Sequence, residues 1–88
     1  MALVSLRGPL RKLAGGTPQL ELEGLTVIEL LRGLEARHPE ITGWILDERG
    51  RVRRHINVYV NGERGVEETP VGGGDRVEVL PAITGGSA

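Results

Sequence analysis

Thr-Val-Ile-Glu-Leu-Leu-Arg-Gly-Leu, residues 26–34, is the stretch that decides the fold of this chain. Thr26 and Glu29 have the spacing of a capping box, which satisfies orphan backbone N–H groups at the start of a helix. Leu25 precedes the cap and is expected to pack against Leu30 as a hydrophobic staple. The apolar residues recur at intervals of three and four and predict one buried helical stripe: Val27, Leu30, Leu31 and Leu34.

Segments with alternating apolar residues on both sides of this helix predict β-strands. The four segments are residues 2–6, 19–23, 55–60 and 76–80. The first two precede the helix and should form a hairpin with a long connection, in which Leu10 and Leu13 tuck under a loop. Asn61-Gly62, directly after the third strand, has the sequence of a tight hairpin turn.

The order strand, strand, helix, strand, strand favours an α+β fold of the β-grasp (ubiquitin-like) type. In this arrangement one main helix packs across a mixed sheet of four to five strands, so that both apolar faces are buried. A ferredoxin-like fold would need a second long helix between strands, which the sequence does not offer.

The connections contain the remaining apolar residues. A helical turn is expected within residues 41–46, where Ile41 and Ile45 close the open end of the core, with Trp44 as a further candidate. Residues 63–74 are expected to be mostly loop, solvated at Glu67-Glu68 and anchored by the two valines of the segment. These are Val66 and Val71.

Length, charge and cysteine content exclude several classes of protein. The 88 residues make one small domain. Eleven Lys and Arg against twelve Asp and Glu argue against a nucleic-acid binder. No apolar run approaches the roughly 20 residues of a membrane span, and the absence of cysteine fits the cytoplasm. Trp44 and Tyr59 are the only aromatic residues, so the core should be aliphatic.

The last residues differ from the rest of the chain. Pro81 should end the last strand, because proline donates no hydrogen bond to a sheet ladder. The residues that follow are uncharged, lack an apolar period and include the pair Gly85-Gly86. We therefore expect a domain over residues 1–81 and a flexible tail over residues 82–88. A tail without Cβ atoms can enter a channel too narrow for other residues.

Several runs of the second half resemble a known family. They are Ile-Asn-Val-Tyr-Val-Asn at 56–61, Gly-Asp-Arg-Val at 74–77 and Leu-Pro-Ala-Ile-Thr-Gly-Gly at 80–86. Together with the strand order they are similar to the small ubiquitin-like sulfur carriers of the MoaD, ThiS and CysO kinds. The resemblance is greatest to the carriers of cysteine synthesis, and it is sharp only from about Ile56 onward.

The resemblance implies a co-substrate rather than an enzyme. The carboxylate of Gly86, with Gly85 before it, would be adenylated by a ubiquitin-activating-type enzyme, which binds ATP and Mg; the carrier itself binds no cofactor. Sulfide or a persulfide would then displace AMP and leave a thiocarboxylate, which a cysteine-synthase-like or other sulfur-accepting synthase consumes. Docking of partners is assigned to outward residues near the tail: Tyr59, Glu78, Leu80 and Ile83.

One departure from the family pattern concerns Ser87 and Ala88, which follow the second glycine. The resemblance implies an active form that ends at Gly86, so the chain as written would be a precursor. A zinc metalloprotease of the deubiquitinase-like kind is the expected partner that cuts between Gly86 and Ser87. The alternative is that both residues are tolerated or are remnants of cloning.

Two other functions stay open at this point. A ubiquitin-like modifier joined to lysines of target proteins would share the first activation step, and a β-grasp binding module would leave the tail passive. No catalytic set and no metal site can be assembled from the motifs, and His38 and His55 are interpreted as surface residues. The basic cluster is interpreted as a solvated loop rather than a site for an acidic partner or RNA: Arg49, Arg51, Arg53, Arg54 and His55.

Overall fold

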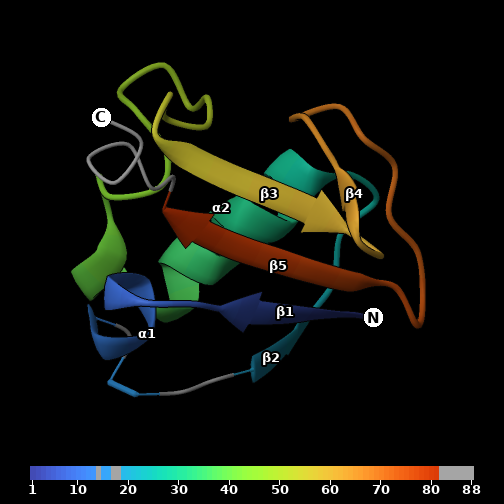
Figure 1. The fold of residues 1–88 in the computed structure, drawn as a ribbon, viewed down its shortest axis with the longest axis horizontal. Helices are drawn as coiled ribbons and strands as arrows, with labels where there is room; N and C mark the ends of the chain where they lie inside the picture. Colours follow the sequence, from blue (N-terminus) through green and yellow to red (C-terminus); the bar gives the residue numbers. More distant parts are fainter. Residues whose placement is uncertain (14, 17–18, 82–88) are drawn as a thin grey trace.

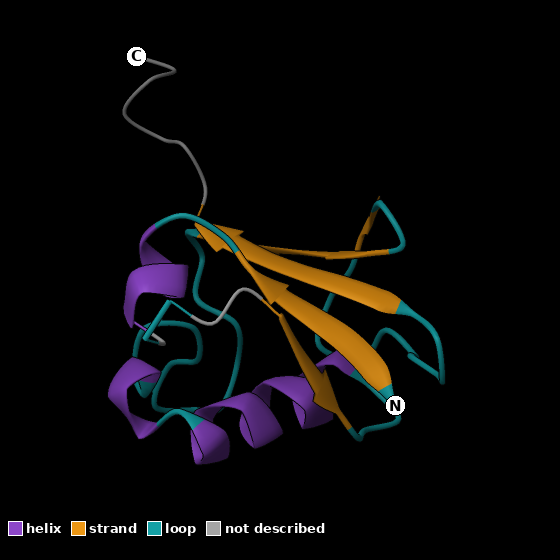
Figure 2. Ribbon diagram, turned by 90° about the horizontal axis from the view of Figure 1, so that it is seen from below, coloured by secondary structure: helices purple, strands orange, loops and turns teal. Residues whose placement is uncertain are grey.

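The computed structural model describes residues 1–13, 15–16 and 19–81 of the chain. In chain order its elements are β1 (Ala2–Leu6), α1 (Pro9–Leu13), β2 (Gln19–Leu22), α2 (Val27–Arg37), the 3₁₀ helix η1 (Pro39–Ile41), β3 (Ile56–Val60), β4 (Glu63–Arg64) and β5 (Arg76–Pro81). The strands form one sheet, and α2 lies across a single face of it (Figures 1 and 2). The opposite face of the sheet carries no helix in this part of the chain.

The last strand occupies the centre of the sheet, whose order is β2-β1-β5-β3-β4. β5 runs parallel to β1, with Leu6 opposite Val79. It runs antiparallel to β3, with Ile56 opposite Pro81. The other strand pairs are antiparallel, so the sheet is mixed. β1 therefore pairs with β5 as far as Val79, and β3 pairs with it as far as Pro81, directly before residues 82–88.

The start of α2 follows the predicted capping box with one difference. The backbone N–H of Glu29 donates to Oγ1 of Thr26 at 3.5 Å, as expected. The carboxylate of Glu29, however, accepts from the N–H of Leu25 at 2.9 Å instead of from the cap residue itself. The predicted staple between Leu25 and Leu30 is wrong, because the side chain of Leu25 is 75% exposed.

The core between α2 and the sheet is aliphatic, as the scarcity of aromatic residues predicts. The predicted stripe of α2 is fully buried, at 0% exposure for each of its residues. It packs against the inward side chains of the strands, which alternate with outward ones. These inward residues are Ala2, Val4, Leu6, Leu22, Ile56, Val58, Val77 and Val79.

Three local predictions are corrected by the structure. The segment expected as a loop after β1 contains the short helix α1, which begins at Pro9 because proline suits the first position of a helix. This helix buries Leu10 against the core. The helical turn expected at 41–46 lies earlier, in η1, although Ile41 and Ile45 do close the core. Trp44 does not take part, since 52% of it is exposed.

The loop after β4 is held by different residues from those expected. Val71 is buried, but Val66 is 59% exposed and anchors nothing. Glu67 is not simply solvated: its Oε2 accepts from the N–H of Val52 at 3.0 Å, and its backbone carbonyl accepts from the N–H of Ile28 at 3.0 Å. A charged side chain therefore joins this loop to the segment before β3.

The turn at Asn61-Gly62 is confirmed. Asn61 and Gly62 have φ angles of 52° and 86°, the left-handed values that a two-residue hairpin turn requires. The turn places Glu63 opposite Val60 and adds β4 to the sheet edge. No helix within the described residues has the length and apolar composition that crossing a membrane requires.

Candidate functional site

The candidate site is built around the end of β5, which we call the tail root (Leu80 and Pro81). A Cβ added at Gly8 would lie 3.8 Å from Pro81, so the segment after β1 passes close to this end. On the other side, Ile56 pairs with Pro81 at the start of β3. The tail root is thus paired with β3 on one side and lies near the segment after β1 on the other. Ile83, Gly85, Gly86 and Ser87 of the predicted site lie outside the described residues.

The structure brings the other three predicted docking residues onto the outer face of the sheet, the face away from α2. Tyr59 of β3 lies directly opposite Glu78 of β5, and Leu80 lies opposite Asn57. Each is partly buried, while their sequence neighbours Val77 and Val79 are fully buried on the inner face. The alternation of the strand therefore separates a core face from a face available to a partner.

The charge of this outer face is balanced by a residue that the sequence did not point to. Nη2 of Arg7 lies 2.6 Å from Oε2 of Glu78, across the parallel pair of β1 and β5. Both side chains are partly exposed, at 62% and 36%, so water screens the pair and it adds little stability. Only the register of two strands distant in sequence brings Arg7 to Glu78.

A shallow hollow of about 660 Å³ continues this face over β1 and β2. Its lining is polar and carries both charge signs: Leu3, Ser5, Arg7, Gln19, Asn61, Gly62, Arg76 and Glu78. A surface of this kind, with the aromatic Tyr59 and the apolar Leu80 beside it, suits recognition of another protein rather than enclosure of a small molecule.

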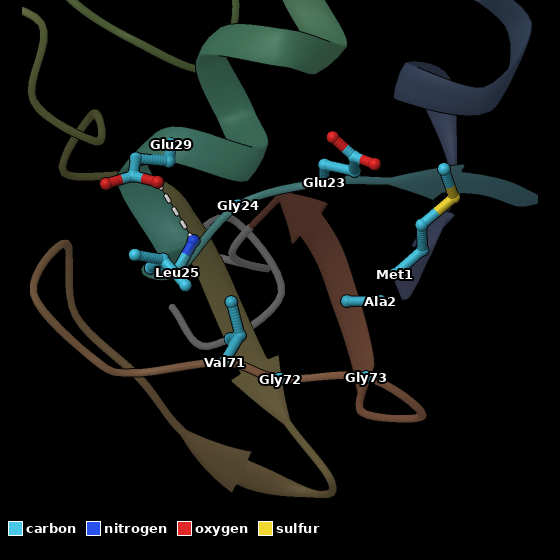
Figure 3. A pocket seen from close by; sticks show the side chains of 9 residues that line it. All are labelled: Met1, Ala2, Glu23, Gly24, Leu25, Glu29, Val71, Gly72 and Gly73. Carbon is cyan, nitrogen blue, oxygen red and sulfur yellow. Dashed lines mark hydrogen bonds between the residues drawn. The ribbon is translucent and has the colours of Figure 1, made fainter.

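A second hollow, of about 500 Å³, lies at the opposite end of the sheet, where β1 begins (Figure 3). Val71 and exposed Leu25 face it, and its edge includes Gly24, whose added Cβ would lie 3.0 Å from Leu30. The carboxylate of Glu29 points to the N–H of Leu25 and is occupied by that hydrogen bond. This hollow is a packing feature of the helix start.

The histidines do not assemble a site with other ligands. Nδ1 of His38 lies 3.2 Å from Oε2 of Glu40, and the hydrogen bond of Glu40 with its own backbone, followed by that with His38, lowers the pKa of the Glu40 carboxyl. The His38 side chain is only 17% exposed, so it is less of a surface residue than predicted. Among the described residues no group of three or more His, Cys, Asp or Glu could hold a metal ion.

The mixed five-stranded sheet with α2 across one face defines the class of the fold: a ubiquitin-like β-grasp, as predicted. Residues 4–86 match the ThiS family, and the chain belongs to that family. It is 34% identical over 89 residues to the sulfur carrier protein CysO of Mycobacterium tuberculosis, covering 94% of this chain and 96% of that protein.

Two further comparisons agree. A chain in the crystal structure of the Amycolatopsis orientalis BexX/CysO complex superposes with a TM-score of 0.85 at 37% identity, covering 97% of this chain and 99% of that one. Small archaeal modifier protein 3 of Haloferax volcanii is 37% identical over 65 residues, covering 69% of this chain and 70% of that protein. The names of the two curated relatives describe a sulfur carrier and a small archaeal modifier.

Proposed function

We propose that this protein carries sulfur as a thiocarboxylate on Gly86. The observation that carries the proposal is the extent of the family match, which runs from residue 4 to Gly86 and so includes the glycine pair. The 34% identity to a sulfur carrier over nearly the whole chain supports the same function. The fold supplies a rigid handle, and the chemistry takes place at the end of the tail.

The proposed reaction needs no nucleophile from this chain other than the carboxylate of Gly86. That carboxylate attacks the α-phosphorus of ATP in an adenylating partner, and pyrophosphate leaves with its Mg²⁺. Hydrosulfide then attacks the acyl carbon, the bond from that carbon to the AMP oxygen breaks, and a thiocarboxylate remains. Sulfur is a better nucleophile than a carboxylate oxygen, which makes the product a sulfur donor. Glycine lets the acyl carbon approach the nucleotide closely.

The outer face at Tyr59, Glu78 and Leu80 is the proposed docking surface for the adenylating enzyme. The tail leaves from the centre of the sheet, so a partner that covers this face also meets the tail root. The sulfur acceptor is proposed to be a cysteine-synthase-like enzyme, on the identity to CysO. Since the adenylating partner uses ATP and Mg²⁺, we expect the carrier in the cytoplasm.

The test of the sulfur-carrier function uses a chain that ends at Gly86 and one that ends at Gly85. Each is incubated with the adenylating enzyme, ATP and sulfide, and intact mass is measured. We expect exchange of one oxygen for sulfur in the first chain alone, with equal thermal unfolding of both. Adenylation of the chain that ends at Gly85, measured as pyrophosphate exchange, would contradict the role of Gly86.

We further propose that the bond between Gly86 and Ser87 is cut before activation, because the reacting carboxylate has to be that of Gly86. A zinc metalloprotease is the candidate for this step. The full chain, incubated as above without protease, should form no thiocarboxylate. An equal rate for the full chain and the chain ending at Gly86, with Ser87 and Ala88 still attached, would show that processing is not needed.

A modifier function is the second candidate, favoured by the 37% identity to an archaeal modifier protein. The same activated glycine would then form an isopeptide bond with a lysine of a target. The protein itself contains one lysine, Lys12. Polymers in which Gly86 of one copy is joined to a lysine of the next could therefore form only through Lys12. Mass spectrometry of cell extracts separates the two functions: a link from Gly86 to lysine supports a modifier, and a thiocarboxylate supports a carrier.

A further inference from the structure

Trp44 occupies an unusual place for the only tryptophan of a small aliphatic protein. Its neighbours Ile41 and Ile45 are fully buried, yet 52% of Trp44 is exposed. Solitary exposed apolar residues are common on protein surfaces and by themselves indicate nothing. Trp44 differs because the loop that carries it is braced, charged and next to the tail root.

The bracing begins at the two ends of the loop, residues 43–54. Nε of Arg53 donates to the carbonyl of Gly43 at 2.6 Å, and the backbone N–H of Arg53 donates to the carbonyl of Ile45 at 2.9 Å. The N–H of Trp44 donates to the carbonyl of Ile41 at 2.9 Å. The backbone at Trp44 is therefore held from both sides, and the indole is presented on a fixed base.

Two carboxylates hold the middle of the loop. Oδ1 of Asp47 accepts from the N–H of Arg49 at 2.9 Å and of Arg51 at 3.0 Å. Oε2 of Glu67 accepts from the N–H of Val52, while its Oε1 lies 3.6 Å from the Arg51 guanidinium. An exposed loop fixed by so many hydrogen bonds loses little conformational entropy when a partner binds.

The loop lies at the end of the sheet that bears the tail root (Figure 1). The N–H of Ile56 donates to the carbonyl of Arg53 at 3.0 Å, so the loop leads straight into β3. Ile56 in turn pairs with Pro81. A partner that binds at the tail root would therefore lie next to this loop. Leu25, which is more exposed than Trp44, lies at the other end of the sheet.

The charge of the loop indicates the surface that it fits. It contains four arginines, at 49, 51, 53 and 54, and two acidic residues, of which Asp47 is engaged within the loop. Arg51 lies near Glu67 and Arg53 donates to Gly43, so the exposed Arg49 and Arg54 are the arginines offered to a partner. Tryptophan and arginine are the residues most often found at binding hot spots. Arginines around an aromatic anchor complement an apolar recess with an acidic rim.

We propose that the 43–54 loop is a second docking surface for the adenylating partner, separate from the outer face of the sheet. Trp44 enters an apolar recess beside the mouth of the tail channel, and the arginines meet an acidic rim around it. The loop is thus more than the solvated segment that the sequence alone indicated. This inference rests on the proposed function, because it assumes a partner that takes up the tail.

The single tryptophan makes the contact directly measurable. The chain ending at Gly86 is produced with 5-fluorotryptophan, which gives one ¹⁹F signal, and is titrated with the unlabelled adenylating enzyme. We expect this signal to shift or broaden on binding, and to lose its sensitivity to solvent. The titration needs no ATP or sulfide, so it reports binding even where thiocarboxylate formation fails.

Three variants give the energetic test. Trp44→Ala should weaken binding about tenfold or more, the loss typical of a hot-spot residue. Leu25→Ala, which removes a more exposed apolar side chain at the far end of the sheet, should leave binding unchanged. Arg54→Glu should slow association and reduce its dependence on salt, because arginine contacts with an acidic rim steer the encounter.

The outcomes separate the inference from the proposed function. Thermal unfolding of Trp44→Ala should match the parent chain, since the core residues Ile41 and Ile45 are unchanged. Thiocarboxylate formation with an unmoved ¹⁹F signal and equal affinity for Trp44→Ala and Leu25→Ala would overturn the docking role while the function stands. Absence of any binding by the parent chain would overturn both.

Discussion

The two faces of the central sheet differ although the same strands build them. On the inner face Val77 and Val79 of β5 are fully buried under α2. On the outer face Glu78 and Leu80, their immediate neighbours, are half-buried and face away from the helix. Successive residues of β5 therefore alternate between a buried structural position and a position that a partner can contact. If the outer face is the docking surface, stability and recognition should be separable residue by residue.

The largest effect, on the free energy of unfolding, is expected from truncating a buried side chain of the inner face. Val79→Ala removes buried methyl groups and leaves a cavity, which should lower the free energy of unfolding by about 2–3 kcal/mol. Urea denaturation of the chain measures this loss. Binding of the adenylating partner, measured on the fraction that remains folded, should be unchanged. A change in affinity as large as the change in stability would mean that the two faces are not independent.

The reverse pattern is expected for the outer face. Leu80→Ala and Tyr59→Ala should each weaken binding of the adenylating partner about tenfold, as truncation of a central interface residue does. Their effect on the free energy of unfolding should stay below that of Val79→Ala, because both side chains are only partly buried. Calorimetric titration and urea denaturation of the same variants give both numbers. Leu25→Ala, which truncates an exposed side chain at the far end of the sheet, is the matched control.

A smaller effect on the free energy of unfolding is expected from changing Asn61 in the turn after β3. Asn61 accepts from the N–H of Arg76 at 2.9 Å and donates to Oδ1 of Asp75 at 3.0 Å, while its own backbone adopts a positive φ. Asn61→Ala removes these side-chain bonds and should cost about 1–2 kcal/mol of stability. Asn61→Gly keeps the turn and loses only the side chain, so it should be less harmful. Equal losses would show that the backbone conformation contributes nothing.

The smallest expected effect is on the loss of stability at acid pH, through the carboxyl of Asp75. The hydrogen bond from Asn61, and next that from the N–H of Gly72, lower the pKa of Asp75 from its usual 3.8. Because the folded-state pKa is lowered, the stabilisation is complete above pH 3.8 and is lost as the pH falls from there through the folded-state pKa. Asn61→Ala should reduce this acid dependence, measured by thermal unfolding between neutral and acid pH. An unchanged acid dependence would contradict the assignment.

Local sequence patterns predicted most of the fold because they involve neighbouring residues. The capping residues and stripe of α2, the alternation of the strands and the turn at Asn61-Gly62 each follow from short-range geometry. The errors lie where side chains meet partners distant in sequence. Glu67 looked like a solvated loop residue, yet it accepts a hydrogen bond from Val52. Trp44 looked like a core residue, yet neighbouring isoleucines fill that space.

The candidate site divides in the same way. The sequence pointed to Tyr59, Glu78 and Leu80, and strand alternation alone was sufficient to put them on the outward side. The assignment of Ile83, Gly85, Gly86 and Ser87 stays a prediction, because these residues lie outside the described part of the chain. The pairing of Arg7 with Glu78 had no signal in the sequence, since the two residues are far apart along the chain.

The sequence by itself determined the class of fold, the aliphatic core and the glycine pair on which the proposed chemistry depends. These follow from periodicity, composition and the conformational freedom of glycine. The tertiary structure alone decided that β5 lies at the sheet centre, that Arg7 reaches Glu78, and that the braced loop with Trp44 stands beside the tail root. Strand order and long-range hydrogen bonds depend on contacts between segments that are distant in sequence, and no local pattern encodes which segments will meet.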